Sequence, residues 1–319
     1  MPFAQAFNPS GPVAMPGAVY ANLGAKIVPV HHSGPGNLSD APAWFDEEGR
    51  TGINDALSLV RSGRGDIIQL LPGHAQNIAA ADALSNLGTK TGVTILGPFV
   101  GPPAVLTWTA ATSTLLMDAA DFVIDGGPNK NIILNMDPGT GTVNVAAPIT
   151  ISAARCKIRN CRIRMGTDAN SKVTIGVTTT AAADDLEIAG NIVYGATAAE
   201  ATTLFQFVGA DRLHFLDNEV VGATSAANVG VIRFLTTAST DIKMFRNVLR
   251  NNKAASSVVV TGLASNSGEV DQLFMTCLNN NAADLTGAWA TVADITFGRQ
   301  CYVANTIGER AALFGTESA

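Results

Sequence analysis

The residues with the clearest potential for chemistry are five clustered acids: Asp184, Asp185, Asp211, Asp217 and Glu219. Glycoside hydrolysis requires two carboxyl groups about 5–9.5 Å apart in distinct environments. Asp184 and Asp211 also occupy turn positions that look equivalent to that of Asp271, so oxygens along one edge could bind a cation. An Asp in a turn usually accepts hydrogen bonds from its own backbone, however. We therefore predict that the protein is not an enzyme and has no catalytic, cofactor-binding or metal-binding residues.

The cysteine and histidine residues also lack the spacing of a metal-binding site. The four cysteines, at positions 156, 161, 277 and 301, lack CxxC spacing and sit at or near apolar positions. We predict reduced thiols packed in the core, with no zinc, because the four histidines are not spaced as ligands with them. His31 and His32 follow each other in a Pro- and Gly-rich region without nearby carboxylates, which predicts an exposed loop.

Two short motifs are better explained as turns. Arg64-Gly65-Asp66 matches an integrin-type tripeptide, but it lies between a predicted helix end and a predicted strand, where Gly and Asp have ordinary turn roles. The stretch PGTG at 138–141 is Gly-rich, but no Lys follows at the spacing of a phosphate-binding loop and no helix begins there. Neither motif predicts a binding site.

Five basic residues fall within ten positions: Arg155, Lys157, Arg159, Arg162 and Arg164. Alternation with apolar residues directs them outward from one structural unit. They could form a stripe for an acidic partner or a neighbouring subunit. We favour partial neutralisation by Asp185 and Glu187 of the next unit, with Arg162 and Arg164 left over as interface residues.

Composition excludes several classes of protein. Only 14% of the 319 residues are charged and 47% are hydrophobic, which argues against disorder. The net charge of −6 gives no reason to expect nucleic-acid binding. The first 20 residues carry no Lys or Arg, which argues against a secretory signal peptide. No apolar run approaches the ~18–20 residues of a membrane span. We expect no membrane contact and synthesis in a cytoplasm. The few aromatic residues, including Trp44, Trp108 and Trp289, are predicted to be core and not a sugar-binding groove.

The elements that must position these side chains are set by a repeat. The phrase apolar–x–apolar–x–x–Asn–x–apolar recurs about every 29 residues, at 186–193, 213–220 and 242–249. Weaker copies begin at 156, 273 and 301. The second apolar position, at 158, 188, 215, 244, 275 and 303, should form one interior file. A repeat of this length with strand-like alternation indicates a solenoid.

Additional strands are predicted before each phrase, at 173–177, 205–207, 232–234, 258–260 and 295–297. Two or three strands per repeat without long amphipathic helices predict an all-β, right-handed parallel β-helix. Stacked repeats place side chains in outward columns about 4.8 Å apart. One column reads Arg155, Asp185, Arg212, Asp241 and another reads Lys157, Glu187, His214, Lys243. Asn191, Asn218 and Asn247 should form an amide ladder that begins at Asn191, because Cys161 replaces Asn one repeat earlier.

The predicted organisation has three parts. Residues 1–50 form an extended N-terminal arm with a short strand near 25–30, residues 51–306 form the β-helix, and residues 307–319 form a C-terminal tail. A capping helix at 52–62 should cover the open end of the solenoid. A second short helix is predicted near 80–87.

Several stretches resemble tailed-phage structural proteins with a right-handed β-helix: the predicted helix, RGDIIQLLPGHA at 64–75, TGVTILGP at 91–98 and the C-terminal stretch from NTIGER at 305–310. The resemblance covers residues 45–319 and implies a non-enzymatic virion protein. It implies a trimeric decoration or cement protein on the capsid surface, bound to the major capsid protein and made in the host cytoplasm. The alternative is a tailspike-like protein that binds or depolymerises polysaccharide, with a host surface glycan as partner.

Overall fold

The computed structural model describes residues 27–30, 52–78, 89–137, 144–226, 229–235, 239–253 and 258–261. Beyond these it describes the strand segments 270–273, 276–279, 289–290, 295–297, 301–305 and 310–313. The predicted helix near 80–87, the loop at 138–141, His31, His32 and most of the predicted arm lie outside these ranges. Trp44 and Met275 also lie outside them.

Three long sheets make up the molecule. Sheet A contains, in spatial order, β1 (Ile27–Val30), β2 (Ile67–Leu70), β4 (Thr94–Leu96), β7 (Val123–Asp125), β11 (Lys157–Arg159), β16 (Glu187–Ala189), β19 (His214–Leu216), β22 (Ile242–Phe245), β25 (Val270–Leu273) and β28 (Ile295–Phe297). Sheet B contains β3 (Ala75–Ile78), β5 (Ala104–Trp108), β8 (Ile132–Asn135), β12 (Cys161–Arg164), β17 (Ile192–Tyr194), β20 (Glu219–Gly222), β23 (Val248–Asn251), β26 (Thr276–Asn279), β29 (Cys301–Asn305) and β30 (Arg310–Leu313).

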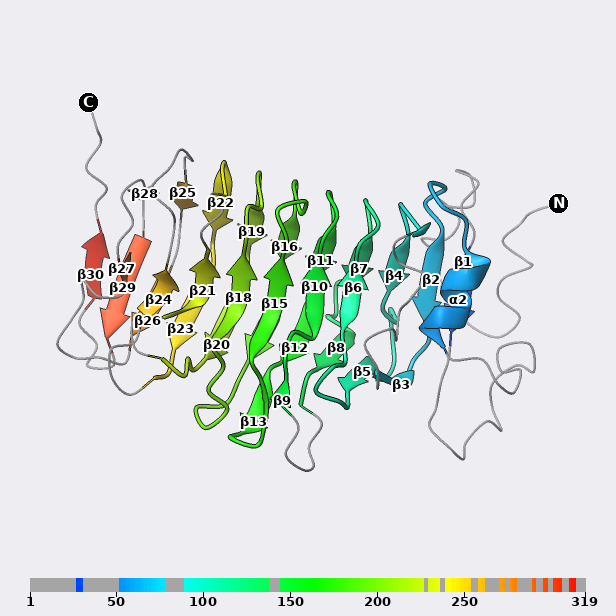
Figure 1. Ribbon diagram of the computed structural model, residues 1–319, viewed down its shortest axis with the longest axis horizontal. Coiled ribbons are helices and arrows are strands. Elements are labelled where there is room, and N and C mark those ends of the chain that lie inside the picture. The colour runs from blue at the N-terminus through cyan, green and yellow to red at the C-terminus, as the bar shows by residue number, and fades with distance from the viewer. Residues whose placement is uncertain are drawn as a thin grey trace.

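Sheet C contains β6 (Leu115–Met117), β10 (Ile149–Ile151), β15 (Ile175–Thr179), β18 (Thr203–Phe207), β21 (Gly230–Phe234), β24 (Val258–Thr261) and β27 (Trp289–Ala290). A small sheet D, of β9 (Asn144–Val145), β13 (Gly166–Asp168) and β14 (Ser171–Val173), projects from the body (Figure 1). The chain visits sheets A, B and C in turn and pairs each strand in parallel with its counterpart in the next coil. The predicted parallel β-helix is confirmed.

The predicted interior file is confirmed as far as Met244. Strand register places Ile158 opposite Ile188, Ile188 opposite Phe215, and Phe215 opposite Met244. All four side chains are fully buried, and the file extends in the N-terminal direction to Ile68 through Ile95 and Ile124. Burial of apolar side chains along this continuous file is the main stabilising term for the stack.

An aromatic cluster fills the interior where sheets A and C face each other. Phe205 and Phe215 meet edge to face with ring centroids 5.2 Å apart, and Phe207 lies 5.3 Å from Phe234. Trp108 is also fully buried, and its indole nitrogen donates to the carbonyl of Pro148 at 2.8 Å. Trp108 and these Phe rings therefore belong to the core, as predicted; the environment of Trp289 is not described.

The last two coils differ from the prediction. Met244 is paired with Gln272 and not with Met275, and Val303 lies in sheet B opposite Cys277. The predicted strand at 295–297 is part of sheet A, not the counterpart of the earlier sheet C strands. Alternating apolar residues occur in the strands of every sheet, and only the corner Asn distinguishes the end of a sheet A strand. These two coils lack that Asn.

The N-terminal end is covered as the sequence suggested, but by a shorter helix. Helix α2 (Ile53–Leu59) ends before the predicted residue 62 because Val60 adopts an extended conformation. Strand β1 pairs with β2, and its own side chains Val28 and Val30 are buried. The side chain of Gln76 accepts a hydrogen bond from the backbone of Ile53 at 3.0 Å, which ties the helix to sheet B.

At the opposite end, β30 folds back and pairs with β29 in the antiparallel direction (Figure 1). This strand lies within the stretch that the sequence assigned to a C-terminal tail. Among the described residues, no helix has the length and apolar character needed to span a membrane.

Sharp corners join sheet C to sheet A through one left-handed residue in each coil. Asp121, Arg155, Asp185, Arg212 and Asp241 all have φ between 53° and 60°. The left-handed region is uncommon for residues other than Gly and costs roughly 1–2 kcal/mol per residue. Most of these corners are joined to the next coil: the amides of Asp121, Arg155, Asp185 and Arg212 each donate to a carbonyl there at 2.7–3.1 Å. The first predicted charge column is therefore a column of corner residues.

Candidate functional site

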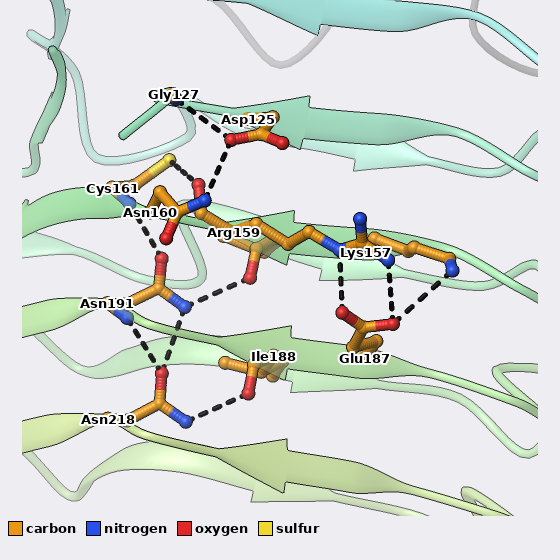
Figure 2. Close-up of polar contacts among 11 residues, drawn as sticks. Asp125, Gly127, Lys157, Arg159, Asn160, Cys161, Glu187, Ile188, Asn191 and Asn218 are labelled. Atoms are coloured by element: carbon orange, nitrogen blue, oxygen red, sulfur yellow. Dashed lines mark hydrogen bonds and ion pairs between the residues drawn. The ribbon is translucent and has the colours of Figure 1, made fainter. Parts of the chain in front are cut away.

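The predicted amide ladder is present at the corner between sheets A and B, where it joins three coils. Figure 2 shows its first step, from Asn191 to Asn218. Asn191 Nδ2 donates to Asn218 Oδ1 at 3.0 Å, and Asn218 Nδ2 donates to Asn247 Oδ1 at 3.2 Å. All three side chains are at most 1% exposed. Cys161 lies at the start of the ladder, where its amide donates to Asn191 Oδ1 at 2.9 Å. Each Asn side chain thus hydrogen-bonds to adjacent coils and fixes the corner of its own coil relative to theirs.

Ion pairs join the corners outside the ladder. Arg212 binds Asp185 with two hydrogen bonds of 2.5 and 3.0 Å, and Arg246 binds Asp217 in the same way at 2.5 and 2.6 Å. The hydrogen bonds from these guanidinium groups lower the pKa of Asp185 and of Asp217. Among the four described residues of the predicted column, Arg155, Asp185, Arg212 and Asp241, only Asp185 and Arg212 form an ion pair with each other, because Arg155 turns toward the preceding coil.

The partner of Arg155 was not predicted from the sequence. Arg155 binds Asp121 at 2.7 and 2.9 Å, and this bond lowers the pKa of Asp121. Asp121 precedes Arg155 by 34 residues, whereas the pairs Asp185–Arg212 and Asp217–Arg246 are separated by 27 and 29. Because this coil is longer, an alignment at a fixed period does not place Asp121 opposite Arg155, as it places Asp185 opposite Arg212.

The second predicted column, on the outer face of sheet A, has the expected register. Lys157 lies opposite Glu187, which lies opposite His214, and His214 lies opposite Lys243. Glu187 binds both Lys157 at 3.3 Å and Arg159 at 2.6 Å (Figure 2). Burial, the largest influence, raises the pKa of Glu187, but the hydrogen bonds and charges of Arg159 and Lys157 outweigh it and lower the pKa overall.

The five candidate acids do not all lie together: Asp184, Asp185 and Asp211 gather around Arg212, whereas Asp217 is held by Arg246. Asp184 accepts a hydrogen bond from the amide of Asp211 in the next coil, and Asp211 accepts from the amide and hydroxyl of Thr240 in the coil after that. Both acids therefore bind the following coil, and not the backbone of their own turn as predicted. Asp185 is held by Arg212 and Asp217 by Arg246, at different corners, whereas Glu219 is exposed on sheet B. Asp271 is not equivalent to Asp184, because β25 places it opposite Lys243.

Acid should weaken the corner ion pairs, and Asp217→Asn tests this. The pKa of Asp217 is lower in the folded protein than the usual unfolded value of about 3.9. A carboxyl of this kind stabilises the fold above its unfolded pKa, and that stabilisation is lost as the pH falls through its folded pKa. In urea unfolding at pH 6, the free energy of unfolding of the wild type should be slightly larger than that of Asp217→Asn. The difference should begin to shrink near the unfolded pKa of about 3.9 and should vanish only at a pH below the folded pKa of Asp217.

Salt provides the control for this experiment. Exposed ion pairs are screened, so about 1 M NaCl should reduce the difference at pH 6. A difference between the two proteins that stays constant from pH 6 to strong acid, at low and high salt, would show that the Asp217–Arg246 pair does not contribute through charge.

The basic cluster is divided between two faces. Arg155 is held at a corner, and Lys157 and Arg159 project from sheet A toward Glu187. Arg162 and Arg164 are exposed on sheet B, and neither forms an ion pair within the described part of the chain. The predicted neutralisation by Glu187 is confirmed, the pairing of Arg155 with Asp185 is corrected to Asp121, and Arg162 and Arg164 remain as the residues left over.

The remaining sequence candidates have structural roles where the structure describes them. Asp66 is fully buried and binds the side chain and backbone of Arg61, so the tripeptide at 64–66 does not present its carboxylate. Cys156 and Cys161 are free, buried thiols, and burial raises the pKa of Cys156 to about 11. The side-chain environments of Cys277 and Cys301 are not described. No group of three or more potential metal ligands occurs among the described residues.

A buried polar contact beside sheet D was also missed. Ser171 Oγ donates to Asp137 Oδ1 at 2.5 Å, and both residues are largely buried. Asp125 similarly accepts from Asn160 Nδ2 at 3.1 Å and from the amide of Gly127 at 2.8 Å (Figure 2). No periodic signal marks the contacts of Asp137 with Ser171 and of Asp125 with Asn160, because these partners lie 34 and 35 residues apart and not at the repeat spacing.

No family model matches the sequence, and no curated protein or solved structure is significantly similar to it.

Proposed function

We propose that the protein is a non-enzymatic structural component of a phage virion, a decoration or cement protein attached to the outside of the capsid as a trimer. The observation that carries the proposal is the engagement of the candidate acids. Asp185 and Asp217 each bind an arginine through both oxygens, and Asp184 and Asp211 each accept a hydrogen bond from the backbone of the following coil. These side chains join coils to one another, which favours a role as a rigid scaffold.

The architecture suits such a role physically. A solenoid whose corners are fixed by amide and ion-pair ladders presents its outer residues at constant spacings of about 4.8 Å. Strand β1 and helix α2 already occupy the N-terminal end of the solenoid. A contact with another protein by strand addition would therefore have to use a different segment of the chain. We propose that the arm before β1 supplies this attachment by adding to the edge of a capsid protein sheet.

The alternative, a polysaccharide-cleaving spike, requires an acid whose pKa is raised so that it can donate a proton. Arginine bonding lowers the pKa of Asp185 and of Asp217. These two candidates are therefore poor general acids, and the proposal of a structural role is preferred. Host-polysaccharide shortening by the purified protein would reverse this preference.

Deleting residues 1–26 should abolish attachment to capsids and leave the β-helix folded. This deletion stops before β1, which begins at Ile27 and covers β2 with the buried residues Val28 and Val30. The measurement is cosedimentation with purified head shells that lack the protein, together with the far-ultraviolet circular dichroism spectrum. Bound protein should fall at least about tenfold, as for the loss of a set of interface anchors.

A deletion of residues 1–30 is the matched comparison. It also removes β1, exposes the edge of β2 and should lower the unfolding midpoint, whereas the deletion of 1–26 should leave the midpoint unchanged. Full retention of attachment by the shorter deletion would refute the role of the arm. Failure of the wild-type protein to bind shells would refute the proposed function.

A further inference from the structure

The outer face of sheet B carries a set of side chains unlike those on the other described faces. Strand register places Arg164, Tyr194, Val221 and Arg250 in one column, on β12, β17, β20 and β23. The neighbouring column contains Arg162, Ile192, Glu219 and Val248 on the same strands. We name the sheet B patch by its six principal residues: Arg162, Arg164, Ile192, Tyr194, Val248 and Arg250.

The patch exposes apolar side chains on two of its strands, β17 and β23. Ile192 is 38% exposed, Tyr194 54% and Val248 38%, and these are three of the five exposed large hydrophobic residues in the described part of the chain. The other two, Leu59 and Val100, lie on separate segments. Ile192 and Tyr194 lie on one strand, and Val248 lies two strands away beyond Glu219. Single exposed apolar residues are ordinary, but several on one sheet face mark an interaction surface.

The arginines of the patch differ from those at the corners. Arg155, Arg212 and Arg246 each bind an aspartate, whereas Arg162, Arg164 and Arg250 form no ion pair with any described residue. Arg250 Nε is also shielded from solvent without a hydrogen-bond partner. With Glu219 as the acid between them, the patch is net positive on a chain of net charge −6. This arrangement is complementary to carboxylates on a partner.

We infer that the sheet B patch binds an acidic protein surface of the head shell, as a second contact beside the arm. This inference rests on the proposed function. Aliphatic and tyrosine side chains with arginines at both ends of the patch have the composition of a protein interface. Ile192 and Val248 offer little to a sugar, whose ring carries hydroxyl groups. The same face of a second copy would place arginine against arginine, which electrostatic complementarity disfavours.

Cosedimentation of full-length variants with purified head shells that lack the protein tests the inference. Arg164→Glu and Tyr194→Ala should each weaken binding by about tenfold or more, because anchors of these types dominate interfaces. The matched controls are Arg64→Glu, which reverses another exposed charge, and Val100→Ala, which truncates a residue that is 62% exposed. Both controls should bind within about twofold of wild type.

Each outcome separates the claims. Shell binding by the wild type that Arg164→Glu and Tyr194→Ala leave unchanged would overturn the patch and leave the proposed function standing. No binding by the wild type would overturn both. Sedimentation velocity without shells identifies the remaining case: an oligomer of the wild type that these two variants dissociate would show that a second copy occupies the patch, which overturns the inferred partner.

Discussion

Replacing Asn218 with alanine should destabilise the β-helix by about 3–5 kcal/mol. The Asn218 side chain accepts from the amide of Asn191 at 3.0 Å and donates to the carbonyl of Ile188 at 2.8 Å. It also bonds to the side chains of Asn191 and Asn247. Each buried polar group that loses its partner costs about 1–3 kcal/mol, and at least two backbone groups lose one here. Urea unfolding followed by circular dichroism measures the change.

Two variants calibrate this prediction. Glu219→Ala removes the exposed neighbour of Asn218 and should change stability by no more than about 0.5 kcal/mol. Asn218→Cys copies Cys161, which is tolerated because it stands at the start of the ladder and no Asn of an earlier coil bonds to it. In the middle of the ladder cysteine should still cost most of the alanine effect. Equal stability of Asn218→Ala and Glu219→Ala would contradict the ladder as a stabilising element.

The fold could be predicted because its interactions repeat. The three strong phrases fixed the interior positions Ile188, Phe215 and Met244 and the ladder residues, and each of these has the expected neighbour in the next coil. In a parallel stack, equal sequence spacing becomes vertical alignment, so one observation sets both the apolar file and the outward columns. Lys157 and Glu187 were paired correctly for this reason.

The parts that sequence reasoning missed depend on loops of unequal length. The pairing of Asp121 with Arg155 was missed because 34 residues separate them, more than the repeat spacing. Asp271 was aligned with turn residues although it belongs to strand β25. The left-handed corners were also missed. Gly63 and Gly92 occupy this position in the first coils, but Asp and Arg replace Gly in the later ones, so no residue type recurs there. The sheet B patch became visible only once strand register set Tyr194 beside Arg164.

Replacing Gly126 with alanine should cause the second large loss of stability, because two coils lie in close contact there. This buried residue follows β7, and its amide donates to the carbonyl of Arg159 in the next coil at 3.0 Å. A β-carbon added to Gly126 would lie 1.9 Å from the backbone oxygen of Asn160. Backbone cannot move aside as a flexible side chain can, so Gly126→Ala must separate the two coils at this corner. We expect a loss of about 3 kcal/mol or more in urea unfolding.

The adjacent glycine separates steric from conformational effects. Gly127 has φ of 71°, and an added β-carbon would have no atom within 4 Å. Gly127→Ala should therefore cost only the left-handed penalty of about 1–2 kcal/mol. If Gly126→Ala does not accumulate as soluble protein while Gly127→Ala does, Gly126→Ala is still the less stable of the two variants, as expected. Equal stability of the two variants would mean that the coils at this corner are farther apart than the hydrogen bond from Gly126 to Arg159 requires, and the tight stacking from which the columns and ladders follow would fail there.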